Sequence, residues 1–132
     1  MILVDTSALL ALLDRDDAFH AAAAAALPAL AAEDALLTHE HILVEVMALA
    51  QHRLGLGALR RLIDDLLPLM EVAWVDATLH AEAREALLAA GRPTISLVDW
   101  TSFLVMRRHG VRRAFTFDAD FASEGFDVVP AA

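Results

Sequence analysis

The feature that most constrains the fold is the first ten residues, where a short apolar run ends in a carboxylate. Ile2–Val4 favour a buried β-strand, Asp5 follows directly, and Thr6-Ser7 then open an Ala/Leu pattern with helical spacing. Ligands of parallel sheets bind at the carboxyl ends of strands, so this order places Asp5 at the mouth of a site. The same residue types are also common helix N-caps, so this segment taken alone favours a plain helix start, and the rest of the sequence must decide.

The rest of the chain alternates strands with helices. Further strands are predicted at 35–38, 71–76, 114–118 and 126–129. Helices are predicted at 7–13, 17–32 with a kink or restart at Pro28, 39–54, 58–67, 77–90, 96–109 and 119–123. This order of βαβ units predicts one α/β domain over residues 1–132, with a five-stranded parallel sheet between two helical layers.

The charge balance bears on which partners the chain can bind. The net charge is −9, with 19 acidic against 10 basic residues, and every basic residue is Arg. This balance repels nucleic acid overall, but divalent cations held by carboxylates reverse the local field, so a polyanionic substrate is not excluded. The absence of cysteine excludes a disulfide framework and a thiolate metal site.

The apolar segments do not indicate membrane insertion or secretion. The N-terminal run lacks a basic flank and contains Asp5, which argues against a signal peptide. The longest apolar stretch, Ala21–Ala32, is interrupted by Pro28 and is too short to cross a bilayer. We therefore expect a soluble, cytoplasmic protein with no membrane partner.

Two predicted helices each carry an acid on an otherwise apolar face. Glu45 projects from the edge of the stripe that holds Ile42 and Val46, and Asp99 shares its face with Phe103. Burying an unpaired carboxylate is costly, so each needs a partner, either an arginine or a metal ion.

Each acid also has an ordinary structural explanation. Asp99 forms a capping-box pattern with Ser96, and Glu45 could pair with an arginine. Asp118 could belong to a turn or cap the short helix at 119–123.

The four acids together are more informative than any one of them. Two follow predicted strands, two face the core from helices, and all can reach one crevice. Without cations they would repel one another and raise their pKa values. All-oxygen ligands suit Mg²⁺ or Mn²⁺, and a pair of such ions can activate water and stabilise the leaving oxygen in phosphodiester hydrolysis.

At these residues the chain resembles the PIN-domain ribonucleases, most closely the VapC toxins of type II toxin–antitoxin systems. The resemblance covers nearly the whole length and rests on these motifs: Val4-Asp5-Thr6-Ser7, Glu45, Ser96-Leu97-Val98-Asp99 and Thr116-Phe117-Asp118-Ala119-Asp120-Phe121. It implies four catalytic metal ligands, Asp5, Glu45, Asp99 and Asp118. It also implies supporting hydroxyls from Thr6 and Thr116.

The same resemblance implies the rest of the functional prediction. The fold would be a PIN-like three-layer sandwich and the protein a homodimer. The activity would be metal-dependent cleavage of RNA, leaving 5′-phosphate and 3′-hydroxyl ends. A cognate antitoxin protein would inhibit it by placing a tail in the acidic groove.

Some side chains leave two interpretations open. A cluster of arginines could grip RNA phosphates or could be helix-end cations on a solvated surface: Arg107, Arg108, Arg112 and Arg113. Trp74 and Trp100 fit the core or a dimer face better than a base-stacking platform.

Three other classes of protein share an Asp at a strand end. A haloacid-dehalogenase-type phosphatase would have Asp where this chain has Ser7, and a response-regulator receiver would need a lysine, which this chain lacks. The remaining alternative is a non-catalytic PIN-like module that binds RNA or protein.

Overall fold

A five-stranded, all-parallel sheet forms the centre of the protein. The computed structural model describes residues 1–131. Its strands are β1 (Ile2–Val4), β2 (Leu36–His39), β3 (Met70–Ala73), β4 (Arg113–Phe115) and β5 (Asp127–Val129). They lie in the order β3-β2-β1-β4-β5. The predicted sheet is confirmed.

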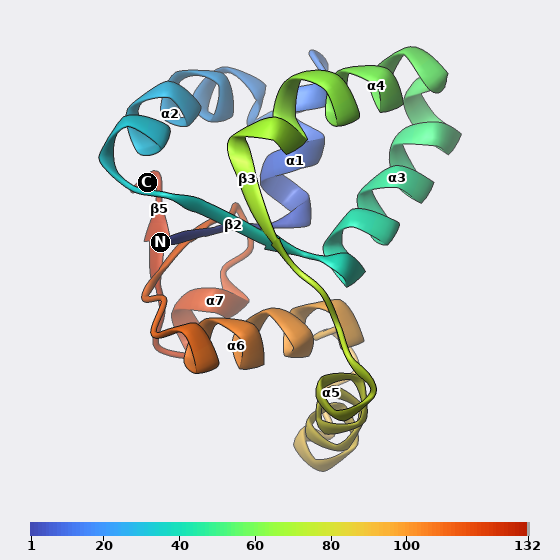
Figure 1. Ribbon diagram of the computed structural model, residues 1–132, viewed down its shortest axis with the longest axis vertical. Coiled ribbons are helices and arrows are strands. Elements are labelled where there is room, and N and C mark those ends of the chain that lie inside the picture. The colour runs from blue at the N-terminus through green and yellow to red at the C-terminus, as the bar shows by residue number, and fades with distance from the viewer. Residues whose placement is uncertain (132) are drawn as a thin grey trace.

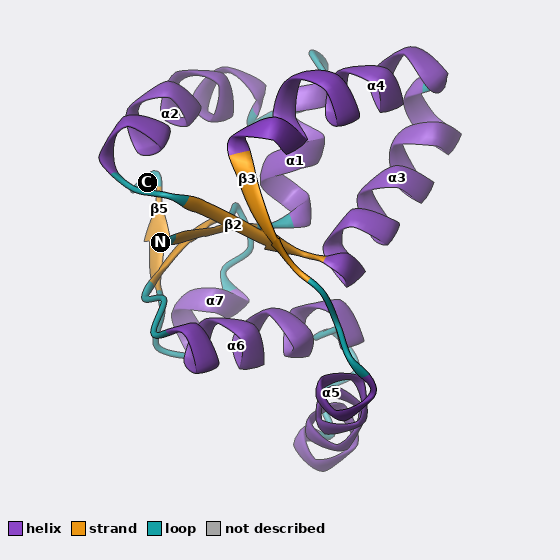
Figure 2. Ribbon diagram, viewed as in Figure 1, coloured by secondary structure: helices purple, strands orange, loops and turns teal. Residues whose placement is uncertain are grey.

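Helices cover both sides of this sheet. They are α1 (Thr6–Leu13), α2 (His20–Glu33), α3 (Glu40–Leu54), α4 (Leu56–Arg61), α5 (Ala77–Ala90), α6 (Leu97–His109) and α7 (Asp120–Ser123). Figure 1 shows α1 to α4 above the sheet and α5 to α7 below it, and Figure 2 shows the strands enclosed between these two layers. The predicted three-layer arrangement is therefore confirmed as well. No helix among residues 1–131 combines the length and apolar content needed to cross a membrane.

The strand order changes direction at β1. The chain runs from β1 outward to β2 and β3, then returns to place β4 on the opposite side of β1. In parallel sheets such a reversal opens a crevice at the carboxyl ends of the two strands that flank it. Val4 is in register with Phe115, so the next residues, Asp5 and Thr116, emerge together at this edge.

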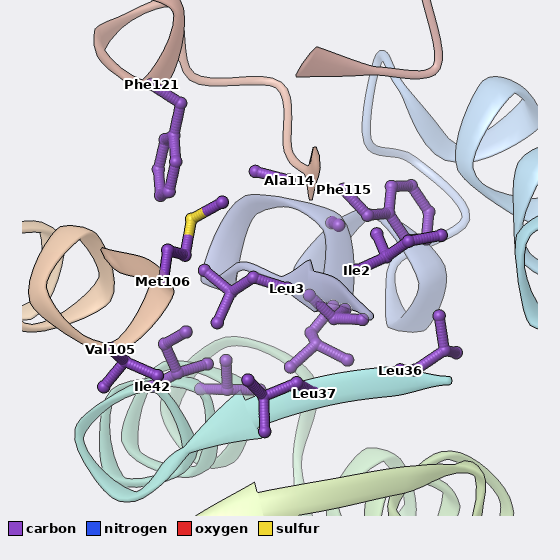
Figure 3. Close-up of a cluster of buried hydrophobic side chains, with 14 of the residues drawn as sticks. Ile2, Leu3, Leu36, Leu37, Ile42, Val105, Met106, Ala114, Phe115 and Phe121 are labelled. Atoms are coloured by element: carbon purple, nitrogen blue, oxygen red, sulfur yellow. The ribbon is translucent and has the colours of Figure 1, made fainter. Parts of the chain in front are cut away.

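The core forms around β1, whose three residues are completely buried. In Figure 3, Leu3 lies toward Val105 and Met106 of α6, whereas Ile2 and Phe115 lie together on the other side. This alternation follows from the two-residue period of a strand. It fixes the register of β1, because a slip of one residue would exchange its two faces.

Several predicted boundaries differ from the structure. The predicted helix at 58–67 is instead α4, followed by a π-helical segment, η1 (Leu62–Leu66), and a 3₁₀ segment, η2 (Leu67–Leu69), that contains Pro68. Proline lacks an amide hydrogen and clashes with the preceding turn, which explains why a regular helix does not continue here. Pro28, in contrast, lies within the single helix α2, with no restart of the helix there.

The predicted strand at 114–118 ends earlier, at Phe115. The amide of Phe117 donates to Ser7 Oγ at 2.9 Å, and that of Asp118 donates to Thr116 Oγ1 at 3.0 Å. These side-chain acceptors replace strand pairing, so the chain turns away from the sheet before Asp118.

Candidate active site

Asp5 lies at the base of the crevice, directly after β1. Its side chain is buried, with 3% of the residue exposed. Its Oδ2 atom accepts hydrogen bonds from Thr116 Oγ1 at 2.9 Å and from Ser7 Oγ at 3.2 Å. The carboxylate is therefore held in position by one hydroxyl from the start of α1 and one from the loop after β4.

The charge on Asp5 is disfavoured in the folded protein. Burial raises the pKa of Asp5 to about 6, and the negative charge of Asp99 adds to the rise. Hydrogen bonds from Thr116, Thr6 and Ser7 oppose this effect without cancelling it. A buried carboxylate with a raised pKa and an acidic neighbour is a candidate functional group.

A network of hydroxyl groups ties the loop after β4 to Asp5. Ser7 Oγ and Thr116 Oγ1 lie 3.1 Å apart, and each also accepts a backbone amide of that loop. The sequence predicted a supporting role for Thr116 but did not assign one to Ser7. Ser7 stands two residues after Asp5 at a helix start, which is where a side chain can turn back toward the strand end.

The hydroxyl of Thr6 is placed differently. It is buried and has no hydrogen-bond partner within the part of the chain that the structure describes. The predicted supporting role of Thr6 therefore stays a prediction. Its unpaired oxygen next to Asp5 leaves a polar group to be satisfied by a water molecule or ligand.

Asp99 lies in the first turn of α6, three residues after the N-cap Ser96, and is part of a complete capping box. Its Oδ2 accepts from the amide of Ser96 at 2.9 Å, and its own amide donates to Ser96 Oγ at 3.2 Å. The structural explanation for Asp99 is thus realised. It does not exclude a second role, because both bonds from Ser96 go to the same oxygen of the carboxylate.

Asp99 is also the electrostatic centre of the four acids. Partial burial raises the pKa of Asp99, and the charges of Asp118 and Glu45 raise it further. Glu45 is half-buried on α3 and lines a groove with Val98, the neighbour of Asp99 on α6. The structure therefore brings the four acids within electrostatic range through Asp99.

Asp118 is half-buried in the turn after β4, and its Oδ1 accepts from the amide of Asp120 at 2.9 Å. The alternative that Asp118 shapes a turn is thus also realised.

None of the four acids pairs with an arginine, since the side-chain ion pairs of arginine found in residues 1–131 use Glu33, Asp34, Glu82 and Glu124.

The donor set fits a hard divalent cation, although the carboxylates in the described part of the chain do not form a complete metal cage by themselves. Four carboxylates without a cationic partner, and the unpaired hydroxyl of Thr6, are oxygen donors of the kind that Mg²⁺ prefers. However, residues 1–131 contain no group of three or more His, Asp or Glu side chains already spaced to hold a metal ion. Mg²⁺ is commonly held by one or two carboxylates together with water, so a complete protein cage is not required.

The predicted RNA-contacting arginines lie away from these acids. Arg107 pairs with Glu124 at 3.0 Å, Arg108 pairs with Glu82, and Arg113 pairs with Glu33 at 2.9 Å. Arg107 follows Asp99 by eight residues, or about 12 Å along α6. Arg113 is the first residue of β4, whereas Asp5 follows the last residue of the neighbouring strand β1, so the two lie at opposite ends of the strands. Arg112 precedes Arg113 and is exposed. Contact of these residues with RNA stays a prediction that their placement does not support.

Comparisons with known proteins give a consistent result over nearly the whole chain. The model of the PIN domain family matches residues 2–126. The 23S rRNA-specific endonuclease VapC20 of Mycobacterium tuberculosis is 36% identical over 130 residues, which cover 96% of this chain and 95% of the relative.

Two solved structures show the same fold. The crystal structure of Mycobacterium tuberculosis VapC20, described as a Sarcin-Ricin loop cleaving toxin, superposes with a TM-score of 0.82 at 34% identity and covers 96% of both chains. FitAcB from Neisseria gonorrhoeae superposes with a TM-score of 0.72 at 22% identity, covering 97% of this chain and 96% of its own.

Proposed function

This chain belongs to the PIN-domain family, and we propose that it is a divalent-metal-dependent endoribonuclease acting as the toxin of a type II toxin–antitoxin pair. The observation that carries the proposal is the burial of Asp5 beside the charge of Asp99, with no arginine pairing with either acid within residues 1–131. A site that concentrates unpaired negative charge is suited to a cation and, through it, to a phosphate group.

The proposed metal ligands and catalytic residues are Asp5, Glu45, Asp99 and Asp118, with Mg²⁺ or Mn²⁺ as the ion. When bound, the ion supplies Lewis-acid chemistry for phosphodiester hydrolysis. The chain's own part is positioning. Thr116 and Ser7 hold Asp5 by hydrogen bonds, and the capping box holds Asp99 at the first turn of α6.

The proposed substrate follows from the relative with 36% identity. VapC20 is named as specific for 23S rRNA and as cleaving the sarcin–ricin loop. We propose an RNA loop of the same class for this chain, cut to leave 5′-phosphate and 3′-hydroxyl ends. An RNA substrate would also place the protein in the cytoplasm.

The proposed partners are a cognate antitoxin and a second copy of the chain, with residues 1–132 forming one PIN-like domain. Large apolar side chains support a protein interface: Val44 on α3 is 62% exposed, Trp74 after β3 is 70% exposed and Leu88 on α5 is 81% exposed. Trp100 is 8% exposed and belongs to the core.

A non-catalytic binding module is the second candidate. Two of the four acids, Asp99 and Asp118, make hydrogen bonds that stabilise local structure, and no three acids have metal-binding spacing among residues 1–131. These features would be retained in a protein that binds RNA without cutting it.

A cleavage assay separates the two candidates. Purified protein is incubated with a hairpin carrying the sarcin–ricin loop, in Mg²⁺, in Mn²⁺ and in chelator. Asp5→Asn is the test variant, and Asp127→Asn, which changes an exposed acid of β5, is the matched control. We expect cutting that needs the metal, is lost in Asp5→Asn and is kept in Asp127→Asn.

Two results would count against the nuclease. Cutting that survives in Asp5→Asn would come from a contaminant or from another site. RNA binding without cutting under any metal, on the hairpin and on total RNA, would favour the binding module.

A further inference from the structure

Two aromatic side chains form a stacked pair beside the acidic crevice. The rings of Phe19 and Phe117 lie 4.6 Å apart, with 9° between their planes. Phe19 occupies the N-cap position of α2, and its large apolar side chain is 49% exposed. Phe117 belongs to the loop after β4 and also contacts the buried ring of Phe115.

This pair lines a cavity of about 570 Å³. The remaining wall is formed mainly by small apolar residues, among them Ala22 of α2, Ala122 of α7 and Val128 of β5. At one side the cavity is bounded by Thr116 and Asp118, which are residues of the acidic crevice. The cavity therefore adjoins the acidic site through these two residues.

The aromatic pair is coupled mechanically to Asp5. The amide of Phe117 donates to Ser7 Oγ at 2.9 Å, and the same hydroxyl donates to Asp5 Oδ2 at 3.2 Å. On the other side, the amide of Phe19 donates to Asp17 Oδ1 at 2.8 Å, which fixes the chain before α2. A ligand that rests on this pair is thus held at a defined position relative to Asp5.

We propose that this cavity binds one unpaired nucleobase of the RNA substrate, stacked against the Phe19–Phe117 pair, next to the phosphate that is cut. The inference rests on the proposed nuclease function and specifies how its substrate is positioned. Every base has a flat aromatic face, and proteins that bind single-stranded nucleic acid stack such bases on aromatic side chains. The volume falls within the range of pockets that bind small organic groups.

The chemistry of the wall favours a base over other parts of the RNA. A phosphate would meet apolar side chains and the carboxylate of Asp118, with no cation among the lining residues. A ribose has no flat face to stack on the aromatic pair, and its 2′-hydroxyl would meet a mainly apolar wall. A base is the neutral, flat part of a nucleotide, and its face can stack on this wall while its polar edge points to Thr116, Asp118 or solvent.

The test follows stacking directly, so that it does not depend on cleavage. A single 2-aminopurine is moved through a single-stranded RNA and through the loop of the hairpin, and its fluorescence is recorded in the first seconds after mixing with protein and Mg²⁺. Phe19→Leu keeps an apolar side chain without the ring, and Phe19→Trp keeps a ring. Because Phe19 is half-exposed, both variants are expected to fold, and thermal unfolding of each variant checks this.

We expect quenching at one position of the RNA. Phe19→Leu should raise the dissociation constant at least roughly fivefold and abolish the quenching, whereas Phe19→Trp should retain both. Equal RNA binding by the wild-type protein and both variants would overturn the proposal, as would quenching that persists in Phe19→Leu. The cavity would then be better explained as a site for an apolar side chain of a protein partner.

The outcomes distinguish this inference from the nuclease proposal. Position-specific quenching that depends on Phe19, in a protein that cuts no RNA, would support the base site and contradict the nuclease. The opposite result is RNA cutting that is equal in the wild-type protein and in Phe19→Leu, with no quenching at any position. That result would support the nuclease and contradict the base site.

Discussion

The hydroxyl of Thr116 lies 2.9 Å from Oδ2 of Asp5, although 111 positions of the chain separate the two residues. The contact exists because β1 and β4 are neighbours in the sheet and are in register up to Val4 and Phe115. It joins the two strand ends where the strand order changes direction, and it is the most deeply buried hydrogen bond of the candidate site.

Asp5→Asn should abolish metal-dependent cutting and stabilise the metal-free protein. The pKa of Asp5 is 3.8 in an unfolded chain and about 6 in the folded protein, so the folded state disfavours the charge. Stability associated with Asp5 is present below pH 4 and is lost as the pH rises through 6. Removing the charge should therefore recover up to roughly 3 kcal/mol at pH 7.5. Urea unfolding at pH 4 and 7.5 measures this gain, and an equal effect of the substitution at both pH values would contradict it.

Thr116→Val should weaken both the fold and the activity. The variant removes the donor to Asp5 and the acceptor of the Asp118 amide, and leaving buried polar groups unpaired costs about 1–3 kcal/mol. Thr116→Ser keeps the hydroxyl and should keep activity. Thermal unfolding and cleavage rates of the two variants are the measurements, and a serine variant as impaired as the valine variant would point to packing of the methyl group instead.

Ser96→Ala should separate the structural role of Asp99 from its proposed metal-binding role. The variant breaks the capping box of α6, should cost about 1 kcal/mol of stability, and should slow cutting without abolishing it, because the carboxylate of Asp99 remains. Asp99→Asn keeps an acceptor for the Ser96 amide and should lose cutting with a smaller loss of stability. Urea titrations and cleavage assays of both variants test this. Loss of cutting in Ser96→Ala alone would show that the cap is essential for the site.

His39 should make the protein less stable in acid. Burial lowers the pKa of His39 to about 3, from 6.5 in an unfolded chain. Its Nδ1 accepts from the amide of Ile42 at 3.3 Å, a bond that protonation would remove. The unfolded chain therefore takes up the proton first, and stability falls as the pH decreases below 6.5. The loss attributable to His39 should be roughly 2 kcal/mol at pH 5 relative to pH 7.

The titration of Asp5 changes stability in the opposite direction over the same range, so the comparison must isolate His39. His39→Asn keeps an N-cap acceptor for α3 without the titrating ring. We expect the difference in unfolding free energy between wild type and His39→Asn to shrink as the pH falls from 7 to 5. A constant difference would contradict the assignment.

Local patterns predicted most of this fold. The run from Ile2 to Asp5 forms β1 and a buried strand-end acid, and the helix predicted at 77–90 has those bounds. The helix predicted at 58–67 is correct only up to Arg61, because leucine spacing alone does not distinguish a regular helix from the π-helical turn that precedes Pro68.

The site was only partly predictable for a related reason. The acids at strand ends and helix starts could be identified from their positions, but their hydrogen-bond partners depend on which strands become neighbours. Phe19 is an ordinary apolar residue next to a turn, and Phe117 belongs to the motif around Asp118 without any role that the motif predicts. Their stacking arises only when the start of α2 and the loop after β4 meet.

The pairing of β1 with β4 also has a consequence for biosynthesis. Asp5 leaves the ribosome 111 residues before Thr116, and a domain generally folds as a unit once its distant segments are available. A partly synthesised chain lacks the strand that closes the crevice. The crevice is therefore complete only after β4 has been synthesised and has paired with β1.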